Sequence, residues 1–175
     1  MNRFAGWVKR IIVIFLIVIV FCAAALFIAS LPGGDRDLGK AIDVSGQSLT
    51  GGKITLSENY GTKATVLCFY DTKSDYGDSM LSAIKAQVSE RYGKDLDVIV
   101  VAMEKEKSAD ALSAYMKEKG VLFEHTLLDA DGSISALYNI SSSPITYFIN
   151  KEGTVRASVL GTLTPSKMQK YLAMI

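Results

Sequence analysis

Sulfur and imidazole groups are scarce in this chain of 175 residues, which holds two cysteines, Cys22 and Cys68, and one histidine, His125. This count excludes a zinc site built from cysteine and histidine. Cys68 lies in an apolar, strand-like run, where a thiol is usually a small buried hydrophobe. Cys22 lies in a run long enough to enter a membrane, so we predict no disulfide between the two. His125 has no serine or cysteine partner in a recognisable arrangement and is predicted to be a structural strand residue.

Carboxylates gather where an apolar run gives way to a helical pattern, at Asp71, Asp75 and Asp78. We predict that Asp78 or Ser79 caps the helix and that the other carboxylates are solvated. A calcium site is the alternative, although the glycine and glutamate spacing of an EF-hand is absent. Residues 129–132 read Asp-Ala-Asp-Gly and are predicted to form a turn before a helix. No metal site and no cofactor are therefore expected.

The N-terminal segment has the pattern of a membrane anchor. Residues 11–29 carry no charge and no proline, and as a helix they would be about 28 Å long, close to the thickness of a bilayer core. Arg3, Lys9 and Arg10 precede this run, and positive charge favours the cytoplasmic side. We predict a cytoplasmic N-terminus over 1–10, a single transmembrane helix over 11–30 and an exported remainder in the cell membrane. A signal peptide cleaved near Ser30 is the alternative.

The exported part begins with a tether and continues as one domain. Residues 31–40 contain one proline and three glycines among alternating charges, which is typical of a linker, so the domain is predicted over 41–175. From residue 31 onward there are 16 basic and 18 acidic residues, a net charge of −2. A mildly acidic body lacks the positive field that binds a phosphate backbone, so no nucleic-acid role is expected.

Strand and helix patterns alternate along the domain. Strands are predicted at 53–56, 65–70, 97–102, 123–128, 145–149 and 155–159, and helices are predicted around 79–92, 108–119, 134–138 and 165–175. The runs 65–70 and 97–102 are almost continuously apolar, as central strands covered on both faces are. The order indicates an α/β fold whose sheet is parallel at its centre and antiparallel at one end, flanked by helices.

Motifs at both ends of the domain carry a family resemblance. The stretches Gly52–Ser57 and Val66–Thr72, and later Tyr138–Ile140, Pro144–Ile149 and Glu152–Gly153, stand in the order of such motifs in known proteins. The chain resembles membrane-anchored thioredoxin-like proteins of the TlpA and redoxin type, also described as AhpC/TSA-like. The resemblance covers 41–175 and implies a thioredoxin-like fold with an N-terminal β-hairpin extension. It also implies thiol-disulfide chemistry and a cis-proline loop at Ser143 and Pro144.

The chain departs from this family where the family does its chemistry. The resemblance places Ser74, Asp75, Tyr76 and Gly77 in the redox loop, with Ser74 and Gly77 at the positions of the Cys-x-x-Cys pair. A serine hydroxyl cannot form a disulfide. In a peroxiredoxin-like register, Asp75 stands where the peroxidatic thiol belongs. A hydrolase that uses Ser74 with a neighbouring base would need an oxyanion hole that the sequence does not indicate.

The expected function is therefore binding rather than catalysis. We expect a membrane-tethered, extracytoplasmic, non-catalytic module whose partner is a protein or peptide held at the cis-proline loop. The alternative is a thiol-disulfide oxidoreductase or peroxiredoxin-like antioxidant protein that acts through Cys68 or a partner's thiols. If the alignment is right, cysteines introduced at 74 and 77 are expected to oxidise readily, because they would span one helical turn.

Overall fold

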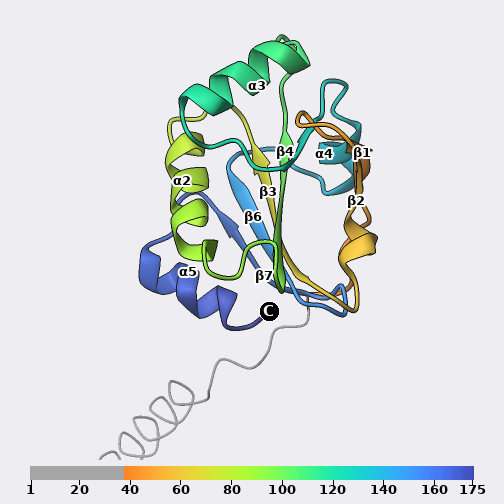
Figure 1. Ribbon diagram of the computed structural model, residues 1–175, viewed down its shortest axis with the longest axis vertical. Helices are drawn as coiled ribbons and strands as arrows, with labels where there is room; N and C mark the ends of the chain where they lie inside the picture. The colour runs from red at the N-terminus through yellow and green to blue at the C-terminus, as the bar shows by residue number, and fades with distance from the viewer. Residues whose placement is uncertain (1–37) are drawn as a thin grey trace, which may run out of the picture. The chain divides into compact units, whose positions relative to one another are not determined.

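A five-stranded mixed sheet forms the centre of the domain, with the strand order β5-β4-β3-β6-β7 (Figure 1). The protein is described by a computed structural model over residues 38–175, which lie within one compact unit. The strands are β3 Ala64–Tyr70, β4 Leu96–Ala102, β5 His125–Leu128, β6 Ile145–Ile149 and β7 Val155–Leu160. β3, β4 and β5 are parallel, β6 pairs antiparallel with β3, and β7 pairs antiparallel with β6. The predicted mixed α/β sheet is thus confirmed.

The two central strands are buried along their whole length. Every residue of β3 and β4 is buried, because layers cover both faces of the sheet. Alternate residues point to opposite faces, so Val66 and Cys68 join one apolar core while Leu67 and Phe69 join the other. This explains why the two runs read as continuously apolar in the sequence.

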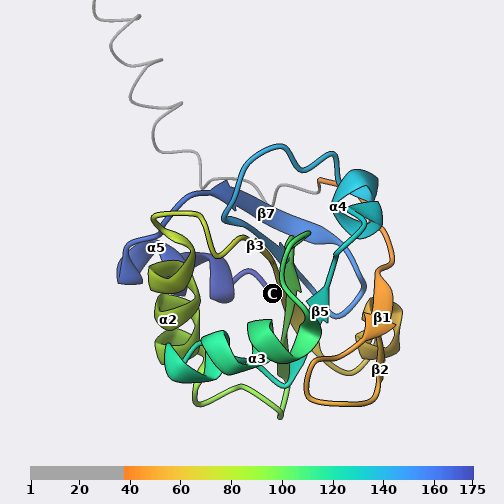
Figure 2. The ribbon, with the colours of Figure 1, turned by 90° about the horizontal axis from the view of Figure 1, so that it is seen from above.

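Three helices cover one face of the sheet, and a smaller layer covers the other (Figure 2). The first face carries α2 Gly77–Val88, α3 Ala109–Glu118 and α5 Pro165–Leu172. The opposite face carries the hairpin β1 Ser45–Gln47 and β2 Lys53–Thr55, the 3-10 turn η1 Leu56–Asn59, and α4 Ser133–Leu137. The three residues of β1 show no apolar pattern that would predict a strand. The strand forms because its backbone pairs with that of β2.

Side-chain hydrogen bonds to backbone N–H groups mark the starts of three helices. Ser108 and Thr164 accept hydrogen bonds from backbone N–H groups at the starts of α3 and α5, as expected for N-cap residues. At α4, the buried Asp129 accepts from the backbone N–H groups of Ile134 and Ser135, at 3.0 and 2.8 Å. Residues 129–132 therefore form the predicted turn before a helix.

The start of α2 differs from the prediction. The helix begins at Gly77, and its N-cap position is Tyr76, which makes no capping hydrogen bond with its side chain. Ser79 donates its hydroxyl to the Tyr76 carbonyl, and Asp78 is held by two tyrosines. The expectation that Asp78 or Ser79 caps this helix was wrong, because the helix begins before both residues, Ser79 donates to a carbonyl of its own turn, and tertiary contacts engage Asp78.

Residues 38–40, which precede the predicted domain boundary at 41, contact the segment around the start of β7. The Leu38 N–H donates to the Val155 carbonyl at 3.0 Å, and Lys40 forms a bridge with Thr154. Within residues 38–175, none of the helices combines the length and the apolar character that crossing a bilayer requires. The predicted transmembrane helix at 11–30 and most of the tether lie outside the described residues.

Candidate functional site

The turn from β3 into α2 places residues 71–77 at the carboxyl end of a central strand. Backbone bonds fold this turn tightly, since the Ser74 N–H donates to the Asp71 carbonyl at 3.1 Å and the Gly77 N–H donates to the Ser74 carbonyl at 3.2 Å. The Lys73 N–H donates to the Asp71 carboxylate at 2.7 Å. Ligands of open α/β sheets bind at the carboxyl ends of the strands, so this turn is a candidate site.

A second loop, 69 residues further along the chain, lies against this turn. The Ser143–Pro144 peptide bond is cis, as predicted, and Ser74 donates its hydroxyl to the Ser143 carbonyl at 3.2 Å. β6, which follows Pro144, pairs with β3, which precedes the turn. Sheet pairing therefore brings the two predicted site segments together.

The surface around the two loops is exposed and partly apolar. Tyr76 is 60% exposed and Leu160, at the end of β7, is 61% exposed. Leu160 pairs with Ile145, and the next residue, Gly161, donates its N–H to the Pro144 carbonyl at 2.7 Å. Two large apolar side chains thus stand in solvent on the elements that carry the loops.

The Glu104 side chain fixes the turn from beneath, a role that sequence reasoning missed. Its side chain is buried and accepts from the Thr72 N–H at 2.6 Å. Lys107 lies 3.4 Å from the same carboxylate and also donates to the Thr72 hydroxyl. A buried carboxylate needs such partners. An acidic residue just after an apolar strand, with a lysine three positions later, is the only sequence signal for this contact.

Asp78 anchors the start of α2 to β3 and α3. Tyr70 donates its hydroxyl to one oxygen of the carboxylate at 2.5 Å, and Tyr115 donates to the other at 2.8 Å. Burial and the Asp78 carboxylate raise the pKa of Tyr70 well above its usual value. Both phenols therefore stay protonated donors at neutral pH, and Asp78 belongs to the packing of the turn.

The Tyr70 ring fills the space beside Gly77. A Cβ atom at position 77 would lie 2.8 Å from Cε2 of Tyr70 and 2.9 Å from the Asp71 carbonyl oxygen. Contacts this short require the ring or the backbone to move. The packing therefore argues against the expectation that a cysteine pair at 74 and 77 would close readily, since a side chain at position 77 needs the Tyr70 ring or the backbone to shift.

Metal binding finds little support at this turn. The Asp71 carboxylate accepts a hydrogen bond within its own turn, and the Asp78 carboxylate accepts from tyrosines. Asp75, the remaining carboxylate, is exposed. Among residues 38–175, the structure gathers no group of three histidine, cysteine, aspartate or glutamate side chains that could hold a metal ion.

Cys68 lies in the interior, away from solvent. It is fully buried in β3, and Thr146 donates its hydroxyl to the sulfur at 3.5 Å. Burial raises the pKa of the Cys68 thiol to about 12. The predicted role of Cys68 as a small buried hydrophobe fits this environment, because a nucleophilic thiol needs access and a low pKa.

Cys68 is expected to resist alkylation in the folded chain. With a pKa of about 12, roughly one thiol in ten thousand would be ionised at pH 8, and only the thiolate reacts. Iodoacetamide labelling of a Cys22→Ser chain, followed by mass spectrometry, should be slow in buffer and fast in urea. Equal rates in the two solutions would contradict this burial.

His125 belongs to a polar network at the opposite end of the strands. Its Nδ1 lies 2.7 Å from the buried carboxylate of Asp97, which also accepts from the Asn59 side-chain amide at 2.9 Å and from the Val98 N–H at 2.7 Å. No pattern in the sequence indicates that Asp97 and His125 meet, because they lie on neighbouring strands 28 residues apart.

Comparison with known proteins shows which family the chain belongs to. Residues 39–158 match the AhpC/TSA family. The chain belongs to the AhpC/TSA family. The thioredoxin-like resemblance inferred from the motifs is thereby confirmed at the level of the family.

Two curated relatives from Bacillus subtilis (strain 168) support this membership. The thiol-disulfide oxidoreductase ResA is 35% identical over 85 residues, which cover 49% of this chain and 47% of ResA. The thioredoxin-like protein YneN is 29% identical over 134 residues, which cover 76% of each chain. The alignment thus spans about half the length of the first relative.

Solved structures share the fold of this AhpC/TSA protein. A thioredoxin-family thiol:disulfide interchange protein from Chlorobium tepidum TLS has a TM-score of 0.67 at 17% identity and covers 81% of this chain and 98% of its own. StoA from Bacillus subtilis has a TM-score of 0.63 at 17% identity and covers 75% and 96%. At these identities the likeness shows the thioredoxin-like fold alone.

Proposed function

We propose that this AhpC/TSA-family chain is a binding module that holds an extended polypeptide against residues 71–77 and the loop before Pro144, without thiol-disulfide exchange. The observation that supports this proposal most directly is the hydrogen bond from the Ser74 hydroxyl to the Ser143 carbonyl, at 3.2 Å. It joins the two loops into one surface and puts a hydroxyl where the family resemblance implies a reactive thiol.

The chemistry of the turn argues against exchange. Ser74 cannot form a disulfide, and the packing of Tyr70 leaves no space for a side chain at Gly77. Cys68 is the one cysteine among residues 38–175, and it is shielded from solvent. ResA is a thiol-disulfide oxidoreductase, so an active relative exists, but the groups at this turn favour recognition over electron transfer.

Recognition of an extended chain needs backbone groups and side-chain pockets. Ser141 and Ser142, which lead into Pro144, are exposed, so their backbone is open to an added strand. Tyr76 and Leu160 offer apolar surface for alternate side chains of such a strand. The expected ligand is therefore an unfolded or extended segment that carries apolar residues.

The proposal is tested with a thiol-free unfolded probe, carboxymethylated α-lactalbumin. Tyr76→Ala and Leu160→Ser should each weaken binding by the full chain at least about fivefold, since each removes apolar contact of about 1 kcal/mol or more. Leu38→Ser is the matched control, because Leu38 is 53% exposed and lies beside the other end of β7. Equal weakening by all three changes, or no binding at all, would contradict a specific surface at the loops.

Catalysis is tested in the same preparation by reduction of insulin. We expect no rate above that of a Cys68→Ser chain, because neither Ser74 nor the buried Cys68 supplies a reactive thiol. A rate that Cys68→Ser abolishes would replace the binding proposal with an oxidoreductase.

We further propose that residues 11–30 anchor the module in the cell membrane with the domain outside. The uncharged 19-residue run and the three preceding positive charges support this orientation. A reporter that is active only in the cytoplasm, fused after Ile175, should be silent, while the same reporter fused before Met1 should be active. Activity of the C-terminal fusion would overturn the orientation.

A further inference from the structure

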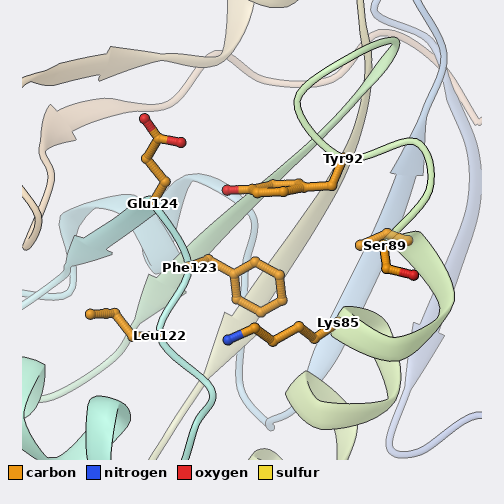
Figure 3. Close-up of a pocket in the computed structure, with 7 residues that line it drawn as sticks. Lys85, Ser89, Tyr92, Leu122, Phe123 and Glu124 are labelled. Atoms are coloured by element: carbon orange, nitrogen blue, oxygen red, sulfur yellow. The ribbon is translucent and has the colours of Figure 1, made fainter.

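A separate cavity of about 300 Å³ opens between α2 and the segment that leads into β5 (Figure 3). Its walls come from the last turns of α2, the connection after α2, and the connection between α3 and β5. Six lining side chains carry the argument: Lys85, Val88, Tyr92, Leu122, Phe123 and Glu124. The cavity is at the lower end of the size range of small-molecule sites.

This cavity is distinct from the loop surface proposed above. Val88 is the last residue of α2, whereas Gly77 is the first. Phe123 and Glu124 precede β5, so they lie at the amino end of that strand, and residues 71–77 follow the carboxyl end of the parallel strand β3. A ligand in the cavity would leave the loop surface open.

The middle of the cavity is apolar and aromatic. Phe123 is buried, and its ring meets the Tyr92 ring edge-on, with centroids 6.0 Å apart and an interplanar angle of 75°. Val88 and Leu122 supply aliphatic walls. An aromatic ring inserted here gains both apolar burial and tilted contacts with the two rings.

The two ends of the cavity carry opposite charges. Figure 3 shows the Lys85 ammonium and the Glu124 carboxylate on opposite sides of the Phe123 ring. The Lys85 ammonium lies 5.8 Å from the centre of that ring and donates one hydrogen bond, to the Gly120 carbonyl at 2.9 Å. An ammonium has three donors, so two are left for an anionic ligand group.

The Tyr92 hydroxyl adds a polar group between these ends. It is buried and points past Phe123 toward Glu124 (Figure 3). It lies near the Glu124 main chain but makes no hydrogen bond of normal geometry within the described part of the chain. Its oxygen has almost no open surface, so a ligand in the cavity contacts the Tyr92 ring rather than its hydroxyl.

We propose that this cavity binds a small aromatic carboxylate, with one six-membered ring, whose carboxylate meets Lys85 and whose far end carries a hydroxyl directed at Glu124. Lys85 repels an amine at its end, and Glu124 repels a second carboxylate at the other. A saturated ring would fill the space but forgo the tilted contacts with Tyr92 and Phe123. A molecule of about ten heavy atoms suits this volume, and its dissociation constant should lie on the order of 0.1 to several millimolar.

The test uses 4-hydroxyphenylacetate as the probe, with the full chain and saturation-transfer NMR. 4-Hydroxyphenylacetamide, which keeps the ring and hydroxyl but lacks the negative charge, should bind at least about tenfold more weakly, and cyclohexylacetate, which has a saturated ring, at least about twofold more weakly. Lys85→Met should weaken 4-hydroxyphenylacetate at least about tenfold, since a hydrogen bond to a charged group is lost. Lys94→Met is the matched control, because Lys94 is exposed and does not line the cavity.

A second variant tests the other end of the ligand. Glu124→Leu should remove the preference for 4-hydroxyphenylacetate over phenylacetate, while binding of phenylacetate itself persists. No binding of 4-hydroxyphenylacetate at 10 mM, on the order of the weakest affinity expected for this ligand size, would overturn the proposal. Equal binding of 4-hydroxyphenylacetamide, equal binding of cyclohexylacetate, or equal effects of Lys85→Met and Lys94→Met would overturn it as well.

Discussion

Gly77→Cys is expected to lower the free energy of unfolding by about 2 kcal/mol, and its pairing with Ser74→Cys is expected to give a chain that closes a disulfide poorly. Any Cβ atom at this position would lie under 3 Å from the Tyr70 ring and the Asp71 carbonyl oxygen. Such overpacking costs about 1–3 kcal/mol. Tyr70 cannot swing away freely, because its hydroxyl donates to Asp78.

Urea denaturation of the reduced chains measures this cost. Ser74→Cys alone is the control and should change stability little, since Ser74 is partly exposed and its replacement is nearly isosteric. A double-mutant cycle with Tyr70→Ala should show a favourable coupling, because the smaller side chain relieves the ring contacts. Ready oxidation of the double-cysteine chain, with no loss of stability, would show that the start of α2 adapts easily to a redox pair.

Asp97→Ala is expected to lower the free energy of unfolding by about 3 kcal/mol. The carboxylate is buried in β4 and accepts from Asn59, His125 and the Val98 N–H. Removing it leaves three donors without their acceptor in a place with little water, and each buried unpaired group costs about 1–3 kcal/mol. The effect should also loosen η1, which carries Asn59.

The matched control is Asp95→Ala, two residues earlier on the same connection. Asp95 forms an ion pair with Arg91 at 3.1 Å, and the Arg91 hydrogen bond lowers the pKa of its carboxyl. Exposed pairs of this kind contribute little to stability, so this change should shift the urea midpoint far less. Equal shifts for the two alanine variants would show that the Asp97 network adds nothing beyond surface charge.

Hydrophobic patterning in the sequence was enough to predict the layered fold. The continuous apolar runs of β3 and β4 and the proline and N-cap of α5 have local signatures, and the structure places each of these elements where its signature stands. The same holds for the turn at 129–132. The residue pattern did not predict β1, because three residues with no apolar pattern become a strand only through pairing with β2, and the hairpin that the two strands form was implied by the family resemblance alone.

The site was predictable only as a pair of segments. Motif spacing pointed to Ser74–Gly77 and to Ser143 and Pro144, but their contact comes from the pairing of β3 with β6. The role of Glu104 could not be predicted from the sequence, because its partner is a backbone N–H 32 residues away. The predicted cap at Asp78 is absent for a related reason. Its carboxylate accepts hydrogen bonds from Tyr70 and Tyr115, which belong to other elements.

By itself, the sequence determined which chemistry the turn can carry, because the residue type sets the functional group. Ser74 supplies a hydroxyl, Gly77 supplies no side chain, and Cys68 places its thiol inside a strand. Tertiary structure alone decided what fills the space around those groups. It set the Tyr70 ring against Gly77, the Glu104 carboxylate beneath Thr72, and Lys85 and Glu124 on opposite sides of one cavity. Such contacts join residues far apart in the chain, and no local pattern encodes them, because they arise from how layers pack rather than from the periodicity of one element.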